Sequence, residues 1–125
     1  MNGNHILVIE DEEICAALIE TVLSARGYQI TTTDQCSEGK RLLQAQQVNY
    51  EAILLDRQLP DMDGLSFLKE LKSLPHLKDI PVIMETSVGD DQSIQQGLES
   101  GAYYYLVKPL QPDLLCTIVH EAIEQ

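Results

Sequence analysis

The chain has 125 residues, and its 20 acidic side chains outnumber its 8 Lys and Arg side chains, giving a formal net charge of −12. This length predicts a single domain, residues 1–125, whose core needs no disulfide, and the charge argues against direct binding to nucleic acid. Three cysteines without a CxxC pair predict reduced thiols in a cytoplasmic protein, and no apolar run is long enough for a signal segment or a membrane span.

Strand-like and helix-like segments alternate along the chain. In chain order we predict a strand at 5–9, a helix at 14–25, a strand at 28–32, a helix at 37–47, a strand at 52–55, a helix at 65–73, a strand at 81–84, a helix at 91–100, a strand at 103–107 and a helix at 112–125. Four of the strands are continuous apolar runs, which is typical of strands buried on both faces. The segment 28–32 alternates and is rich in β-branched residues, so we place it at an edge, beside 5–9. Right-handed crossovers then give a parallel sheet with helices on both faces, a doubly wound α/β domain.

Polar residues stand where four of the predicted strands end. Glu10 and Asp11 follow the first strand, Asp56 follows the third, Thr86 the fourth and Lys108 the fifth. In an open parallel sheet the ligand crevice lies beyond the carboxyl ends of the strands. We therefore expect three acids, a hydroxyl and an amine to share one rim.

Three carboxylates at one rim repel each other unless a cation lies between them, and oxygen-only ligands suit Mg²⁺. Mg²⁺ keeps some of its waters, which leaves a carboxylate oxygen free to act as a nucleophile. Asp56 is the best candidate because it alone is central. Lys108 and Thr86 can hold phosphoryl oxygens, so the set favours phosphoryl transfer.

Several of these polar residues also have structural explanations. The acidic run 10–13 enters a helix, whose dipole favours acids at its N-terminus. Asp61 and Asp63 are predicted to be turn and helix-cap residues. Thr86, taken alone, is explained equally well by the preference of threonine for strands. Glu85 is different, because a carboxylate inside a buried strand needs a partner or a raised pKa, and the sequence alone offers no account of it.

Three stretches together resemble bacterial response-regulator receivers of the chemotaxis-receiver type: ILVIEDE at 6–12, LLDRQLPDMDG at 54–64 and YLVKP at 105–109. The resemblance covers the whole chain and implies a flavodoxin-like sheet of order 2-1-3-4-5 with five helices. It also implies a phosphoacceptor and its metal site. Asp56 would be the phosphoacceptor, and Glu10, Asp11, Asp56 and the carbonyl of Gln58 would bind Mg²⁺ or Mn²⁺.

The resemblance further implies a phosphorylation-dependent switch, which catalyses only its own phosphotransfer and dephosphorylation. Thr86 and Lys108 would contact the phosphoryl group, and Tyr105 would change rotamer as Thr86 moves, remodelling the face made by the fourth helix, fifth strand and fifth helix. The donor would be a phosphohistidine on a sensor histidine kinase or histidine phosphotransfer protein, and the output a downstream protein target. We expect a monomer or weak dimer that binds neither nucleic acid nor membrane directly.

Three other functions deserve comparison. A metal-dependent phosphatase of similar fold would carry a second acid two residues after its nucleophile, where this chain has Gln58. A flavin-binding module would have a phosphate-cradling loop after the first strand, where this chain has acids. A degenerate receiver that only binds partners would have lost residues such as Asp56 and Lys108, which are present here.

Overall fold

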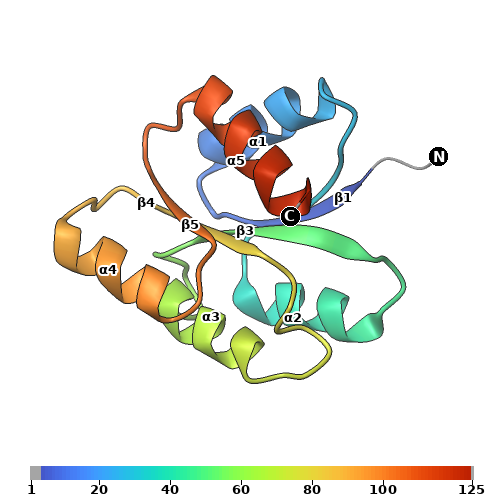
Figure 1. The fold of residues 1–125 in the computed structure, drawn as a ribbon. Helices are drawn as coiled ribbons and strands as arrows, with labels where there is room; N and C mark the ends of the chain where they lie inside the picture. The colour runs from blue at the N-terminus through green and yellow to red at the C-terminus, as the bar shows by residue number, and fades with distance from the viewer. Residues whose placement is uncertain (1–3, 125) are drawn as a thin grey trace.

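The computed structural model describes residues 4–124, over which five strands and five helices alternate (Figure 1). The strands are β1 (His5–Ile9), β2 (Gln29–Thr33), β3 (Tyr50–Asp56), β4 (Val82–Thr86) and β5 (Tyr104–Val107). The helices are α1 (Glu13–Ser24), α2 (Cys36–Ala45), α3 (Gly64–Lys72), α4 (Asp91–Glu99) and α5 (Pro112–Glu124). Every predicted element is therefore present, with ends that differ by at most two residues; residue 125, the predicted end of the last helix, lies outside the described residues.

All strand pairings in the sheet are parallel, and the strand order is β2-β1-β3-β4-β5. Helices α1 and α5 cover one face, and α2, α3 and α4 cover the other (Figure 1). This arrangement confirms the predicted flavodoxin-like, doubly wound α/β fold. The edge position of β2 is also confirmed, because its residues are exposed or half-buried whereas those of β4 are all buried.

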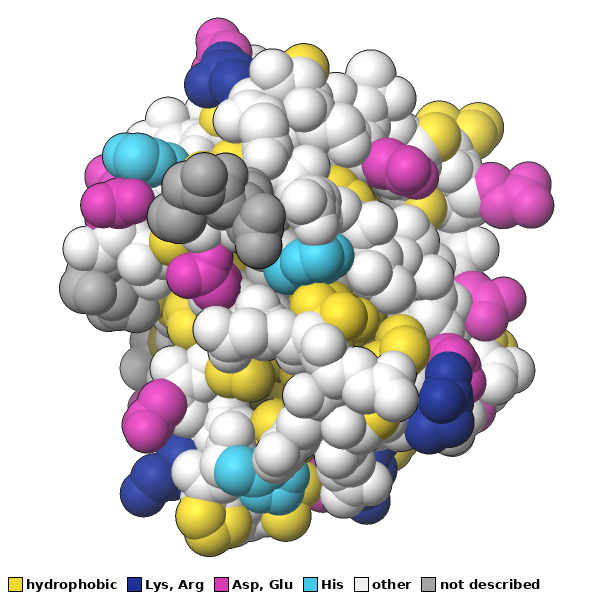
Figure 2. Space-filling view, turned by 90° about the vertical axis from the view of Figure 1, so that its right-hand side faces the viewer, with side chains coloured by type: hydrophobic (Ala, Val, Ile, Leu, Met, Phe, Trp, Pro, Cys, Tyr) yellow, Lys and Arg dark blue, Asp and Glu magenta, His cyan; other side chains and the backbone are white. Residues whose placement is uncertain are grey.

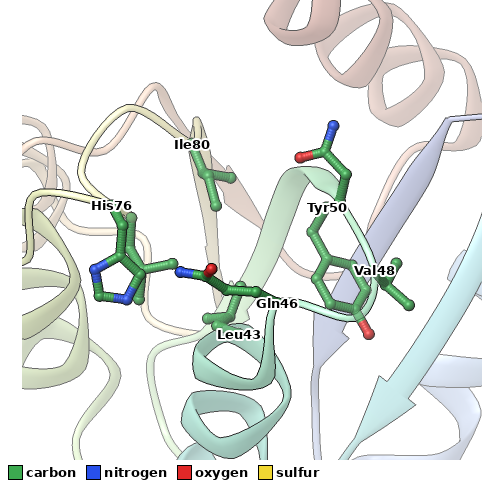
Figure 3. Close-up of a pocket in the computed structure, with 8 residues that line it drawn as sticks. Leu43, Gln46, Val48, Tyr50, His76 and Ile80 are labelled. Carbon is green, nitrogen blue, oxygen red and sulfur yellow. The ribbon is translucent and has the colours of Figure 1, made fainter.

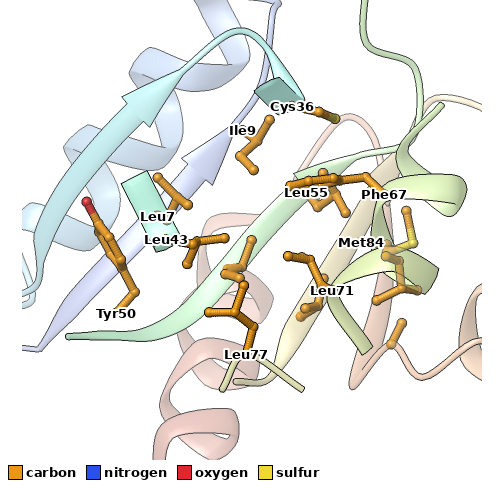
Figure 4. Packing of buried hydrophobic residues seen from close by; sticks show 14 of the residues in the cluster. Leu7, Ile9, Cys36, Leu43, Tyr50, Leu55, Phe67, Leu71, Leu77 and Met84 are labelled. Carbon is orange, nitrogen blue, oxygen red and sulfur yellow. The ribbon is translucent and has the colours of Figure 1, made fainter. Parts of the chain in front are cut away.

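The core has two halves, one on each side of the sheet. Figure 4 shows the half under α2 and α3, where strand residues such as Leu7, Leu55 and Met84 meet Phe67 and Leu71 of α3. On the other face, strand residues contact α1 and α5 in a second cluster, which includes Ile6, Val8, Ile83, Ile19, Leu23, Leu115 and Val119. Burial of each such side chain contributes roughly 1.5–3 kcal/mol, and this apolar packing holds the carboxyl ends of the strands in fixed positions.

Left-handed backbone conformations end three of the helices. Gly27 (φ 94°) follows α1 and Gly101 (φ 111°) follows α4, and glycine adopts this conformation without a steric penalty. Helix α2 ends at Ala45, two residues earlier than predicted, because Gln46 adopts the left-handed conformation (φ 55°) without being glycine. Strand β3 in turn begins two residues earlier than predicted, at Tyr50, which pairs with His5 of β1.

The two aspartates of the loop after β3 have different roles. The Asp61 carboxylate accepts hydrogen bonds from the backbone N–H groups of Cys36 and Ser37, both at 3.0 Å, so it caps α2 from a distant loop. Asp63 stands at the N-cap position of α3 but makes no side-chain cap bond. Its carboxylate instead accepts a hydrogen bond from Arg57 at 3.3 Å, which ties the first residue after β3 to the start of α3.

All three cysteines are free, with Cys36 and Cys116 buried and Cys15 half-buried. Within residues 4–124, none of the helices combines the length and the apolar character that a membrane crossing requires.

Candidate functional site

The predicted site residues lie together at the carboxyl ends of the strands. Glu10 directly follows β1, Asp56 is the last residue of β3, Thr86 is the last of β4, and Lys108 directly follows β5. Because the strands are parallel, these ends meet at the same edge of the sheet. Glu10, Asp56 and Thr86 are almost completely buried, with exposed fractions of 3%, 2% and 0%.

Lys108 is the cation of this cluster. Its Nζ lies 3.0 Å from Oε2 of Glu10, 3.0 Å from Oδ2 of Asp56 and 2.7 Å from Oε1 of Glu12. The lysine side chain is only 11% exposed, so its charge is compensated by these carboxylates rather than by water. Although burial acts to lower it, hydrogen bonds to Glu12, Asp56 and Glu10 raise the pKa of Lys108 above its ordinary value.

The carboxyl groups of Asp56 and Glu10 differ strongly in proton affinity. Burial, together with the neighbouring Glu10 carboxyl group, raises the pKa of Asp56 to about 7. Burial acts in the same direction on Glu10, but the neighbouring carboxyl groups of Glu85 and Asp56, together with hydrogen bonds from the N–H of Glu12 and from Lys108, lower the pKa of Glu10 to about 2. Burial thus disfavours the ionised form of Asp56, whereas the donors around Glu10 favour its ionised form.

Three carboxylates at the rim offer oxygen ligands to a cation. Glu10, Asp11 and Asp56 can each contribute one oxygen atom, and these atoms lie within 4.8 Å of one another. Asp11 is exposed, so its carboxylate is accessible from solvent. A set made only of carboxylate oxygens fits a hard divalent ion such as Mg²⁺.

Gln58 and Thr86 complete the immediate surroundings of Asp56. The backbone N–H of Gln58 donates to Oδ1 of Asp56 at 3.0 Å, leaving Oδ2 to Lys108. The Thr86 hydroxyl donates to Oε1 of Gln58 at 3.2 Å and accepts from the N–H of Val88 at 3.1 Å. The hydroxyl is thus held at the rim by two partners, on the side of Asp56 away from β1.

Tyr105, the predicted switch residue, is buried on the side of α4. Its exposed fraction is 7%, and its ring occupies the space that a Cβ atom at Gly97 would need. Arg57 donates a hydrogen bond from Nη1 to the Tyr105 hydroxyl at 3.3 Å. Its neighbour Tyr104 is 39% exposed, so the aromatics of β5 point to both sides, as their alternation predicts.

Sequence reasoning missed two residues that touch the site. Glu12 makes the shortest contact to Lys108, yet in the sequence it is one of four consecutive acids with nothing to distinguish it. Arg57 links Tyr105 to Asp63 from the position next to Asp56. Its place directly after Asp56 is the only signal that could have drawn attention to it.

Two hollows of the described surface bear on the position of the site. One, of about 810 Å³, adjoins the acidic cluster and is lined by Glu12, Glu13, Ile14, Cys15, Leu18, Ser87, Lys108, Pro109 and Leu110. The other, of about 280 Å³, is lined by Leu43, Gln46, Val48, Asn49, Tyr50, His76, Leu77 and Ile80 (Figure 3). The second hollow includes none of the predicted site residues, so we assign the chemistry to the rim at the carboxyl ends.

The face on the right-hand side of Figure 1 is shown in Figure 2. Its visible Lys and Arg side chains lie far apart, and acidic and histidine side chains lie between them. A continuous basic surface, which a phosphate backbone would need, is not formed by the described residues of this face.

The chain is similar in sequence and in fold to response regulators and their receiver domains. The family model for the response regulator receiver domain matches residues 6–120. A two-component response regulator of Oryza sativa subsp. indica is 33% identical over 123 residues, which are 98% of this chain and 19% of that protein. The receiver domain of a Francisella response regulator superposes with a TM-score of 0.89 at 29% identity, covering 98% of both chains. The Mn²⁺-bound form of response regulator Rcp1 has a TM-score of 0.80 at 28% identity, covering 92% of this chain and 88% of that one.

Proposed function

Because the chain belongs to the response regulator receiver domain family, we propose that it accepts a phosphoryl group on Asp56 and acts as a phosphorylation-dependent switch. The observation that carries this proposal is the position of Asp56. Its carboxylate is buried at the centre of the rim, with Oδ2 3.0 Å from Nζ of Lys108 and Oδ1 3.0 Å from the N–H of Gln58.

The receiver family is confirmed, but the bacterial qualifier of the resemblance is not borne out. Curated relatives come from Oryza sativa and Arabidopsis thaliana, and the chain spans only about a fifth of their lengths, 19% and 22%. The output activity of those longer proteins therefore does not transfer to this chain. We propose that residues 1–125 form one receiver domain that signals by protein contact.

In the proposed reaction a carboxylate oxygen of Asp56 attacks the phosphorus of a phosphohistidine. The new O–P bond forms as the P–N bond breaks, and the electron pair of the broken bond returns to the imidazole nitrogen. Lys108 already lies beside Asp56 and would pair with an oxygen of the transferred group, while Thr86 would donate to another. Positioning and charge neutralisation account for most of the catalysis in such transfers.

We propose that Glu10, Asp11, Asp56 and the carbonyl of Gln58 hold Mg²⁺ or Mn²⁺. Support comes from the oxygen ligands that the three acids bring within 4.8 Å of one another, and from the solved relative described as Mn²⁺-bound. When bound, the cation would neutralise charge on the carboxylates and on the incoming phosphoryl group. Glu10, one methylene longer than aspartate, would be able to reach it through water.

The proposed output is a change in the face made by α4, β5 and α5. Thr86 would leave its bond to Gln58 for the phosphoryl group, and Tyr105 would respond by changing rotamer. Several large apolar side chains on or beside this face are partly exposed, namely Val88, Leu98, Tyr104, Val107 and Leu114. We propose that a downstream protein target binds this face. We also propose that the protein is cytoplasmic and is a monomer or weak dimer.

The surface beside the site suggests where a protein donor docks. Ile14 is 88% exposed and lines the hollow next to Lys108, so an apolar contact there would bring a phosphohistidine close to Asp56. We expect Ile14→Glu to slow phosphoryl transfer from a protein donor about tenfold, while the rate with acetyl phosphate stays unchanged.

The test uses purified histidine phosphotransfer proteins carrying a radiolabelled phosphoryl group, mixed with the chain in Mg²⁺. Label should appear on wild type and disappear after brief alkaline treatment, as an acyl phosphate does. Leu98→Glu, a comparable change on α4, serves as the control for Ile14→Glu. Equal rates of transfer to Ile14→Glu and to wild type would contradict the proposed docking role of Ile14. Phosphorylation by acetyl phosphate but by none of the phosphotransfer proteins would contradict the proposal that the donor is a phosphohistidine.

A further inference from the structure

Arg57, the residue directly after Asp56, has a side chain that contacts three other parts of the fold. Its Nε donates to Oδ1 of Asp63 at 3.3 Å, its Nη1 to the Tyr105 hydroxyl at 3.3 Å and its Nη2 to Oε1 of Gln96 at 3.5 Å. A guanidinium group can make all three contacts because its donors point in several fixed directions within one plane. The end of β3 is thereby linked to the start of α3, to β5 and to α4.

The backbone of Arg57 is held on both sides. Its N–H donates to the carbonyl of Glu85 in β4 at 2.8 Å, and its carbonyl accepts from the N–H of Gly64 in α3 at 2.8 Å. The side chain is also largely covered, with an exposed fraction of 16%. Because the backbone is fixed and most of the side chain is enclosed, the guanidinium group has a narrow range of positions.

Tyr105 lies where its hydroxyl needs a polar partner. A Cβ atom at Gly97 of α4 would lie 2.5 Å from Cδ2 and Cε2 of the Tyr105 ring, so the ring fits there because Gly97 has no side chain. A tyrosine that is almost completely buried normally has a hydrogen-bond partner for its hydroxyl. Arg57 is that partner.

A surface ion pair with Asp63 is the simpler explanation for Arg57. The Asp63 side chain is 50% exposed, and ion pairs of such exposed groups contribute little to stability. The ion pair accounts for only one of the three contacts, however. The other two join Arg57 to β5 and α4, so the ion pair is better described as fixing the orientation of the guanidinium group toward them.

We propose that Arg57 is a positioning residue for Tyr105: its guanidinium group, oriented by Asp63, holds the tyrosine ring in its buried orientation against α4. A rotamer change that carries the ring outward has to break the contact with Arg57. This contact therefore sets the ratio of the two ring orientations before any phosphorylation. The inference rests on the proposed function only in treating the Tyr105 rotamer as part of the output.

The first test measures the exposure of Tyr105 in the metal-free, unphosphorylated protein. Hydroxyl-radical labelling, analysed by mass spectrometry of peptides, gives the labelling rate of Tyr105 relative to its neighbour Tyr104, which is 39% exposed. Arg57→Met should raise this ratio about threefold, the change in population expected for the loss of one hydrogen bond. Arg41→Met removes an exposed arginine of α2 from its ion pair with Glu38, and this matched control should leave the ratio unchanged.

Phe67 distinguishes a local effect from loss of the fold. Its side chain is 1% exposed and belongs to the same half of the core as Tyr105, so its labelling rises only if the protein unfolds. An unchanged Tyr105 ratio in Arg57→Met, or a rise that Phe67 shares, would overturn the positioning role. An equal rise in Arg41→Met would overturn it as well.

A second measurement separates this inference from the proposed function. Incubation with acetyl phosphate and Mg²⁺ should change the Tyr105 labelling ratio in wild type, and should change it less in Arg57→Met, where the ring already leaves its buried orientation more often. An equal change in both proteins would contradict the role of Arg57. If wild type is not phosphorylated at all, the proposed function fails, and the metal-free comparison still decides whether Arg57 positions Tyr105.

Discussion

Replacing Lys108 by methionine is expected to slow phosphorylation of Asp56 about a hundredfold while leaving the protein folded. Methionine approximates the length of the lysine side chain but has no charge and no donor. The amine lies 3.0 Å from Asp56, where it would pair with charge that develops on the transferred group. Removal of one such preorganised donor typically slows a reaction by two to three orders of magnitude.

The same substitution should also lower the free energy of unfolding in metal-free buffer by about 3 kcal/mol, because it leaves buried Glu10 and Asp56 without their cation. Mg²⁺ should reduce this difference by supplying the missing charge. Urea titrations with and without Mg²⁺ measure both effects. Lys69→Met, at an exposed position of α3, is the matched control and should change stability by less than about 0.5 kcal/mol. Wild-type rates in Lys108→Met would show that the amine does not contact the phosphoryl group.

Gly64→Ala is expected to destabilise the chain by about 3 kcal/mol and to displace the phosphoacceptor. A Cβ atom at Gly64 would overlap the carbonyl oxygen of Asp56 and lie 2.9 Å from Cα of Arg57. Both neighbours are backbone atoms of the segment that carries Asp56, so the clash can be relieved only by a backbone shift that separates this segment from the start of α3. The free energy of unfolding, measured by urea titration, and the rate of phosphorylation should therefore both decrease.

Gly39→Ala is the control for this change. It is also a helical glycine, and its Cβ would lie 2.6 Å from Cδ1 of Ile9, the tip of a flexible side chain that can rotate away. We expect it to destabilise by about 1 kcal/mol or less and to leave the rate of phosphorylation unchanged. Equal losses in the two variants would mean that the position of Asp56 does not depend on the close approach of Gly64.

The residues of the rim could be predicted because they follow from strand order and from a rule about parallel sheets. The runs at 5–9 and 81–84 are apolar and short, and the residues just beyond such runs must meet at one edge. Asp56, Thr86 and Lys108 were found in this way without any knowledge of their contacts. The same reasoning placed β2 at an edge, because alternation along 28–32 is incompatible with burial on both faces.

The contacts among these residues could not be predicted, because they depend on side-chain conformations over long sequence distances. Glu12 and Lys108 are 96 positions apart, and only the folded loops after β1 and β5 bring them together. Glu85 is a clearer case, since its buried carboxylate accepts a hydrogen bond from Cys15 of α1, 70 positions away. Propensity and periodicity describe one segment at a time and contain no such information.

The central claim, that Asp56 is the phosphoacceptor, is tested most directly by intact mass spectrometry after incubation with acetyl phosphate and Mg²⁺. Wild type should gain the mass of one phosphoryl group, and only when Mg²⁺ is present. Asp63→Asn, which changes a half-exposed aspartate of the same loop, should gain it as well, and Asp56→Asn should not. An adduct that persists in Asp56→Asn, or a wild-type protein that gains no mass in Mg²⁺, would contradict the account.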